Sequence, residues 1–278
     1  MSVNTPPLFF KGFSYKKYST CGSATKQANG SKTESTALTL WNKPLGLSSH
    51  NRKSQITNLE RNMLQLTPRA RSLIVGILLS DAWMNKSGHW NPRLGLKQST
   101  RRDDVKNFPF LLYVYSELAY LCSAPLYKGK QITRDKTFYS WSFQTRQLGC
   151  FIEIWNLFYI LENKKFVKTI KDDLFFYMNY LVLAFWIQGD GRKCGKSLVL
   201  NTQSFTLNEI ILLINILIIK FDINPYLQND RGNYRIYISG KDLNKIVPKI
   251  KPYFVYSMLY KLNIQNPARE GGGGGKPR

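Results

Sequence analysis

Residues 183–191 read LAFWIQGDG, and residues 74–82 read IVGILLSDA. Each stretch predicts an apolar helix in which a small residue stands just before an aspartate, Asp190 in one and Asp81 in the other. An acid at the C-terminal end of a helix is opposed by the negative end of the helix dipole. A bound divalent cation would offset that repulsion, and two carboxylates with nearby helix carbonyls suit Mg²⁺. The two stretches therefore predict a shared metal site.

Small residues in the same stretches predict that the two helices pack closely. Gly76 and Ser80 are four residues apart and share one face of the first helix. Ala184 and Gly189 are the candidates for the matching face of the second helix. Either stretch alone is also consistent with a buried core helix that happens to end in aspartate. Two stretches in register with an internal repeat favour a paired acidic site.

The chain repeats one order of elements, which predicts two similar subdomains related by a pseudo-twofold axis. Thr67-Pro68 is a helix start, with a capping residue followed by proline at the first helical position. The first half then predicts a polar turn at 85–88, a strand at 93–98, a helix at 103–121, strands at 126–133 and 137–145, and a helix at 149–161. The second half predicts a basic connector at 164–171, a helix at 172–188, a strand at 197–201, a helix at 206–220, strands at 225–229 and 234–239, and helices at 241–250 and 253–262.

Composition divides the chain further. Residues 1–62 are poor in acids and in periodic pattern and are predicted to be a largely irregular extension. The first 33 residues contain no acid, which hints at a mitochondrial presequence, although no arginine precedes Arg52. We expect the first subdomain at 63–163, the second at 164–265 and a flexible glycine-rich tail at 266–278. The hydrophobic cluster at residues 8–13 is a candidate to dock on the main body.

The net charge predicts a polyanionic partner. The chain of 278 residues has 40 Lys and Arg against 17 Asp and Glu, a formal net charge of +23. Nucleic acid is the first candidate, and an anionic membrane or an organellar ribosome are alternatives. No apolar run reaches the ~18–20 residues that a membrane span needs, so we expect no membrane-spanning segment. Four cysteines without a CxxC and two histidines without an HExxH argue against a disulfide framework, a zinc ribbon and a histidine-based nuclease.

Position by position, the two stretches resemble the LAGLIDADG motif. Gly76 matches its first glycine, and Asp81 and Asp190 fall on its last acidic position. Residues 197–206 and 251–262 also resemble segments of mitochondrial intron endonucleases of this family, so the likeness spans about residues 66–263. The resemblance implies an α+β fold with two pseudo-symmetric αββαββα subdomains, a two-helix interface and two saddle-shaped antiparallel sheets that meet DNA. It further implies a monomer located in the mitochondrion.

The resemblance also implies a function: a site-specific, magnesium-dependent endonuclease that cuts both strands of duplex DNA in intron homing and leaves short 3′ overhangs. Asp81 and Asp190 would bind the metal, and Lys168 and Lys251 would assist beside it. Gln98 and Gln203 would position water or contact DNA. The alternatives are a group I intron RNA maturase, whose partner is intron RNA, and a non-catalytic nucleic-acid-binding or ribosome-binding derivative.

Alternating strands predict the DNA-contacting side chains. Arg93 and Lys97 lie on one face of their strand, while Leu94 and Leu96 lie on the other. Together with the second half, the candidates for DNA contact are Arg93, Lys97, Arg192, Lys193, Arg235 and Tyr237. A solvated sheet face would give the same alternation, so the net charge decides for phosphate contact.

The sequence also departs from the family pattern. Leu79 and Gln188 stand at motif position 6, where the family name has an acid. Phe185 replaces a small residue in the second stretch, so we expect an asymmetric helix crossing, and Lys97 stands where relatives are expected to have an acid. None of these departures removes the two aspartates.

Overall fold

The structure is a computed structural model that describes residues 56–100, 107–133, 136–230 and 232–264. It also describes a short strand pair, β1 (Thr39–Leu40) and β2 (Lys43–Pro44). Most of the predicted extension, including its acid-free first 33 residues and the cluster at 8–13, lies outside the described residues, as does the predicted tail at 266–278.

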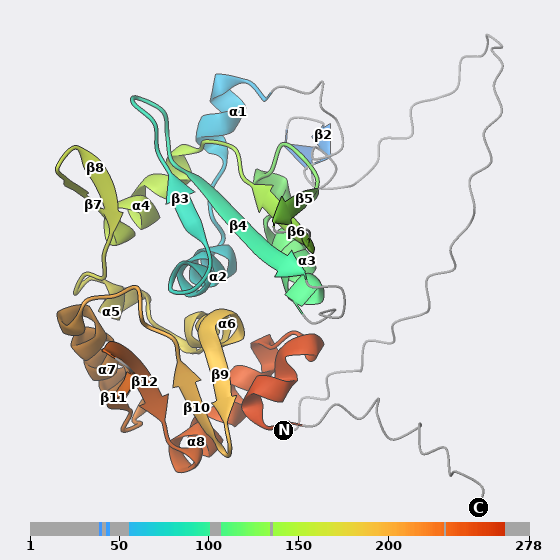
Figure 1. Ribbon diagram of the computed structural model, residues 1–278. Helices are drawn as coiled ribbons and strands as arrows, with labels where there is room; N and C mark the ends of the chain where they lie inside the picture. Colours follow the sequence, from blue (N-terminus) through green and yellow to red (C-terminus); the bar gives the residue numbers. More distant parts are fainter. Residues whose placement is uncertain are drawn as a thin grey trace, which may run out of the picture. The chain divides into compact units, whose positions relative to one another are not determined.

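Each half of the main body forms one four-stranded antiparallel sheet with helices against it (Figure 1). The first sheet has the order β3-β4-β6-β5, and the second has the order β11-β12-β10-β9. The first half comprises α2 (Pro68–Leu78), β3 (Trp83–Asn85), β4 (Arg93–Thr100), α3 (Asn107–Leu118), β5 (Tyr127–Thr133), β6 (Lys136–Gln144) and α4 (Ile152–Phe158). The second comprises α6 (Tyr180–Asp190), β9 (Gly191–Cys194), β10 (Ser197–Leu200), α7 (Leu207–Phe221), β11 (Tyr226–Asp230), β12 (Asn233–Ile238) and α8 (Gly240–Ile250). The αββαββα order that the resemblance implied is confirmed in both halves.

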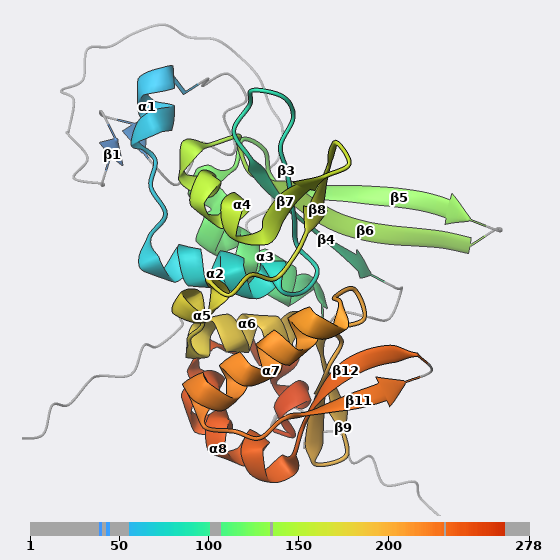
Figure 2. The same ribbon diagram turned by 90° about the vertical axis from the view of Figure 1, so that its left-hand side faces the viewer.

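Helices α2 and α6 lie side by side in both views and join the two halves (Figures 1 and 2). Thr67 caps α2 by accepting from the Ala70 N–H at 3.1 Å, and Pro68 is its first residue, as the sequence predicted. The last two turns of α2 and nearly all of α6 are buried. This apolar pair therefore forms the centre of the core from which both sheets are held.

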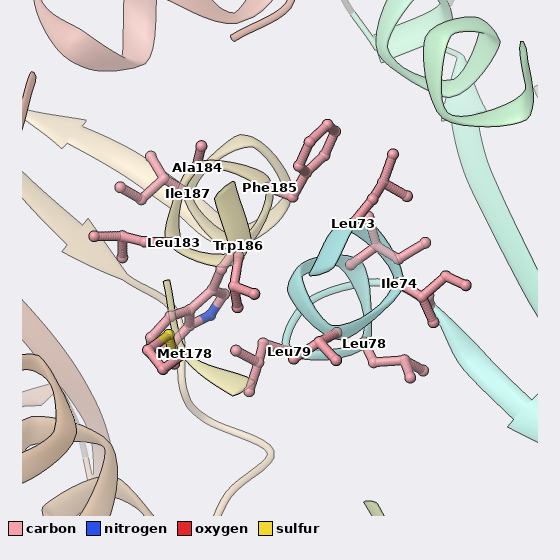
Figure 3. Packing of buried hydrophobic residues seen from close by; sticks show 14 of the residues in the cluster. Leu73, Ile74, Leu78, Leu79, Met178, Leu183, Ala184, Phe185, Trp186 and Ile187 are labelled. Atoms are coloured by element: carbon pink, nitrogen blue, oxygen red, sulfur yellow. The ribbon is translucent and has the colours of Figure 1, made fainter. Parts of the chain in front are cut away.

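Close packing of α2 on α6 depends on small residues. A Cβ added at Gly76 would lie 2.7 Å from the Val182 carbonyl oxygen and from the Phe185 Cβ, and one added at Gly189 would overlap Ser80. Ala184 differs: it points away from α2, on the far side of α6 (Figure 3). Its assignment to the helix interface was wrong, because Val182, Phe185 and Gly189 occupy the facing stripe and Ala184 is about half a turn away from Val182.

Replacing Gly76 with alanine tests this crossing. Because the nearest atoms include main chain of α6, the helices must separate, and we expect a loss of about 1–3 kcal/mol in the free energy of unfolding. Gly149→Ala is the matched control, since a Cβ there would meet its nearest neighbour, the Asn91 amide, at an ordinary 3.9 Å. Urea denaturation of both variants gives the comparison. Equal stability of Gly76→Ala and Gly149→Ala would contradict the close crossing.

The segment between the two halves differs from the prediction. A hairpin of β7 (Tyr159–Glu162) and β8 (Lys165–Lys168) replaces the end of the predicted helix 149–161 and most of the predicted connector. Asn163 and Lys164 form its two-residue turn with φ of 48° and 63°, so the predicted boundary after residue 163 falls inside this turn. The predicted helix 172–188 is two helices, α5 (Leu174–Tyr177) and α6, because Asn179 caps α6 through the Leu181 and Val182 N–H groups.

Short elements account for the other differences. Helix α1 (Asn58–Met63) lies within the predicted irregular extension and is fixed by a capping box between Thr57 and Glu60. Strands β3 and β9 were not predicted, because each follows its helix directly and is too short to show alternation. In place of the predicted helix at 253–262, the structure has two 3₁₀ helices, η3 (Lys251–Tyr253) and η4 (Tyr256–Leu262). Among the described residues, no helix has the length and apolar character needed to cross a bilayer.

Candidate active site

The ends of α2 and α6 bring Asp81 and Asp190 to one pocket between the two halves. Asp81 follows the last turn of α2 and is exposed, whereas Asp190 is the last residue of α6 and is partly buried. The two carboxylates are close enough for the charge of Asp81 to affect the ionisation of Asp190. The close helix crossing therefore places side by side two acids that are far apart in the chain.

Amide side chains hold the two aspartates in different ways. The Gln98 Nε2 on β4 donates to the Asp81 carboxylate at 2.7 Å, which fixes the orientation of that carboxylate. Asn201, just after β10, donates through Nδ2 to the main-chain oxygen of Asp190 at 3.0 Å and not to its carboxylate. Gln203 is not beside the aspartates. With its amide oxygen turned toward Arg235, it accepts from Nε at 3.1 Å and from Nη2 at 2.7 Å.

Two lysines stand at the ends of the central helices. The half-buried Lys168, at the end of β8, donates to the Ala82 carbonyl at 3.3 Å. Lys261, on η4, is 7% exposed and donates to the carbonyls of Gln188 at 2.6 Å and Gly189 at 2.8 Å. Burial lowers the pKa of each lysine to about 8, against the opposing effect of the two aspartates. A proton can therefore leave either lysine more easily than an ordinary lysine.

Lys261 replaces Lys251 as the lysine of the second half. Lys251 is exposed on η3, and the structure does not bring it to the aspartates. The sequence offered one signal for Lys261: it lies between Met258 and Leu262, the other buried residues of the predicted last helix, and so occupies an apolar face. A lysine on such a face needs buried acceptors, and the C-terminal carbonyls of α6 supply them.

These lysines change the argument that required a metal at the helix ends. Lys261 places a cation on the last carbonyls of α6, which is the usual way to offset the negative end of a helix dipole. Lys168 places a second cation near the end of α2, on the carbonyl of Ala82, which lies beyond the last residue of the helix. Acids at these helix ends therefore do not by themselves require a metal, and the paired carboxylates remain available to a cation.

The ionisation of Asp190 makes a testable prediction about the metal-free protein. Burial, and next to it the charge of Asp81, raises the pKa of Asp190 to about 7 despite Lys261 and Lys168. In the unfolded chain this carboxyl has its ordinary pKa of about 3.9, so the folded state binds more protons between pH 4 and 7. The free energy of unfolding should therefore fall as pH rises through that window. Asp190→Asn should make this dependence on pH less steep in urea denaturation with EDTA. An unchanged dependence would contradict the raised pKa of Asp190.

The sheet register decides which predicted DNA contacts share a face. In the first sheet, Leu96 pairs with Phe143 on the buried face, so Arg93 and Lys97 lie on the opposite face. In the second sheet, Val199 pairs with both Arg192 and Tyr237, which therefore lie on one face with Arg235. Lys193 pairs with the fully buried Leu198 and so lies on the other face of the sheet from Arg192, and both residues line the aspartate pocket.

Arg235 is held in place on its sheet face. It forms an ion pair with Asp230 across the β11–β12 pair at 2.6 Å, and Gln203 contacts the same guanidinium. Asp230 and Gln203 therefore orient Arg235 before any DNA binds. The role predicted for Gln203 beside the metal is not supported by this position, whereas a role in DNA contact is compatible with it.

Comparison with known proteins identifies the family. The profile of the LAGLIDADG DNA endonuclease family matches residues 71–246. The chain belongs to this family. The probable intron-encoded endonuclease 1 of Wickerhamomyces canadensis is 30% identical over 221 residues, which cover 74% of this chain and 89% of that protein. The LAGLIDADG fold is therefore shared over nearly the whole length of that relative.

A solved structure and a maturase extend the comparison. The homing endonuclease I-WcaI bound to its DNA recognition sequence matches with a TM-score of 0.64 and 26% identity, covering 77% of this chain and 91% of that one. The cytochrome b mRNA maturase bI2 of Saccharomyces cerevisiae is 29% identical over 217 residues, 74% of this chain. This chain spans about half of that maturase, since the match covers 50% of it. LAGLIDADG relatives thus include proteins named for DNA cleavage and for RNA processing.

The donor set at the LAGLIDADG helix ends fits a hard divalent cation. Asp81 and Asp190 supply carboxylate oxygens, and the described residues contain no cluster of three or more His, Cys, Asp or Glu side chains. Such a set leaves most coordination positions to water and to a substrate phosphate, which is how Mg²⁺ is usually held. Burial first, and then the charge of Asp81, raises the pKa of Asp190 to about 7, and a bound cation would favour its ionised form.

Proposed function

We propose that the protein is a site-specific endonuclease that hydrolyses phosphodiester bonds in both strands of duplex DNA and acts in intron homing. The observation that carries the proposal is the pair Asp81 and Asp190 in one pocket, with the buried Lys261 lining it and the half-buried Lys168 near both carboxylates. A protein that only binds nucleic acid has no need of two adjacent acids facing a polyanion. The family membership and the relatives named as endonucleases support the same reading.

Each residue has a distinct part in the proposed reaction. Asp81 and Asp190 would hold the divalent cation, which we propose to be Mg²⁺ and which, when bound, supplies Lewis-acid stabilisation of the phosphate. Gln98 keeps the Asp81 carboxylate in one orientation. Lys168 and Lys261, with pKa values near 8, can stabilise developing negative charge or exchange a proton near neutral pH. The cuts would leave short 3′ overhangs.

The sheet faces would hold the duplex over this pocket. Arg93 and Lys97 from β4, and Arg192, Arg235 and Tyr237 from the second sheet, lie on the faces turned away from the helices. A net charge of +23 supports phosphate contact along both faces. We further propose that the protein acts as a monomer, because each half supplies one sheet and one aspartate. Cytochrome b in the name of a relative supports a mitochondrial location.

The second candidate function is that of an RNA maturase. It is favoured by the likeness to the cytochrome b mRNA maturase bI2, of which this chain spans half. A maturase would use the basic faces for intron RNA and would not need the paired aspartates. Both functions can coexist in one chain, so each requires its own assay.

One experiment separates the two candidates. A supercoiled plasmid that carries the intron-insertion junction should be linearised with magnesium by the intact protein and spared by the Asp81→Asn, Asp190→Asn double variant. Splicing of the cognate intron RNA is measured with the same two proteins. If the intact protein does not linearise the plasmid and both proteins stimulate splicing equally, the endonuclease function is rejected and the maturase function is supported.

A further inference from the structure

Gln188 joins the last turn of α6 to the segment that carries Lys261. Its side chain is 1% exposed and fully hydrogen-bonded. Its Nε2 donates to the Ala184 carbonyl at 3.2 Å and to the Tyr253 carbonyl at 3.1 Å, and its Oε1 accepts from the Val255 N–H at 2.7 Å. Two of these bonds cross from α6 to the turn between η3 and η4. A buried amide with both ends satisfied fixes that turn in one position.

The main chain of the same residue holds the other end of η4. Val255 is the residue that precedes η4, and Lys261 lies near its C-terminal end. Lys261 donates to the main-chain oxygen of Gln188 at 2.6 Å. Gln188 thus contacts the start of η4 through its side chain and the lysine through its carbonyl. The start of η4 and Lys261 are therefore both attached to Gln188.

The first half holds its lysine by a different device. The residue at the position of Gln188 in the first stretch is Leu79, which is buried and has no polar side chain. Lys168 is instead placed by the β7–β8 ladder, in which it pairs with Tyr159. The Tyr159 hydroxyl accepts from the Met84 N–H at 2.9 Å, and its ring stacks on Trp155 with centroids 4.2 Å apart. The two lysines are therefore independently supported.

We propose that Gln188 is a positioning residue for Lys261 and, through it, sets the rate at which one of the two DNA strands is cut. The inference rests on the proposed endonuclease function. The two halves repeat one fold around the helix pair, and the two strands of a duplex repeat one backbone. We therefore assign the cleavage of one strand to each half. Loss of the Gln188 amide leaves the Tyr253 carbonyl and the Val255 N–H without partners, and η4 with Lys261 moves from Asp190. The strand served by Lys168 is unaffected.

Strand-resolved cleavage tests the proposal. Gln188→Leu introduces the residue of the matching position, Leu79, and Tyr159→Phe is the matched variant in the first half. With each strand of the target labelled separately, Gln188→Leu should cut one strand about 10- to 100-fold more slowly and accumulate nicked DNA. Tyr159→Phe should slow the other strand. Gln188→Glu keeps an acceptor for the Val255 N–H but turns a carboxylate oxygen toward the Ala184 and Tyr253 carbonyls, so it should also slow that strand. An equal slowing of both strands by Gln188→Leu would overturn the proposal.

A second readout does not depend on cleavage. Amine labelling of the intact protein, read by mass spectrometry at each lysine, should find Lys261 protected by its burial in the unchanged chain. In Gln188→Leu, Lys261 should become reactive while the labelling of Lys168 stays as it is in the unchanged chain, which also reports that the variant is folded. Unchanged protection of Lys261 in this variant would overturn the positioning role. If the unchanged protein cuts no DNA but Lys261 still becomes reactive in Gln188→Leu, the endonuclease function is rejected and the positioning role of Gln188 is kept.

Discussion

Asp190→Asn is expected to lower DNA cleavage by about a thousandfold or more. The amide keeps the size and packing of Asp190 at the end of α6 but removes one of two carboxylates available to a divalent cation. DNA affinity should not fall, because the change removes a negative charge from a surface that faces phosphates. Single-turnover cleavage of the target, with binding measured in parallel in Ca²⁺, separates the two effects.

The matched control is Asp172→Asn, which makes the same change at an exposed aspartate outside the pocket. It should cut at the rate of the unchanged chain. Cleavage that persists in Asp190→Asn, or that falls equally in both variants, would remove Asp190 from the reaction. Asp81→Asn should behave as Asp190→Asn does, since both carboxylates line the same pocket.

The second large effect is expected from Lys261→Met. Lys261 is 7% exposed and places its ammonium on the last carbonyls of α6, beside Asp190. Methionine keeps the length of the apolar stem and removes the charge, so cleavage of one strand should fall about 100-fold. The free energy of unfolding should fall by about 1–3 kcal/mol, because buried carbonyls lose a charged donor. Strand-resolved cleavage and urea denaturation measure the two losses.

Lys251→Met is the control with the same change in net charge. Lys251 is exposed on η3, so its loss should leave stability and the cleavage rate nearly unchanged. Both variants should lose the same small share of salt-dependent DNA affinity. A larger cleavage defect in Lys251→Met than in Lys261→Met would restore the lysine that the sequence resemblance first implied.

The sequence predicted the features that are local or repeated. The two stretches that contain Asp81 and Asp190 carry their own apolar pattern and small residues, so the helix pair could be inferred from them, whereas the α+β fold followed from the resemblance to the LAGLIDADG family. The position of Gly76 on the face of α2 that contacts α6 could also be predicted, because Gly76 and Ser80 are four residues apart. Ala184 could not be placed in this way, because a small residue within a buried helix can face either neighbour, and only the packing of Phe185 and Val182 against Gly76 decides it.

Features set by tertiary contact escaped prediction. Lys261 is distant in sequence from the carbonyls it contacts, and only the fold of η4 against α6 brings it there. Gln188 was interpreted as a departure from the motif, whereas its amide holds the turn that leads to Lys261. The β7–β8 hairpin was not predicted, because its lysines made the segment look like a basic connector. Its turn, Asn163-Lys164, is also not among the strongest turn pairs for positive φ.

Cleavage-site selection tests the central claim most directly. The intact protein is incubated with a library of organellar or randomised duplex DNA, with magnesium or with EDTA, and the ends produced are sequenced. The proposed function predicts one enriched target, cut in both strands with short 3′ overhangs, only with magnesium and not by Asp190→Asn. No enriched site, or cutting that survives in EDTA or in Asp190→Asn, would contradict a metal-dependent endonuclease built on Asp81 and Asp190.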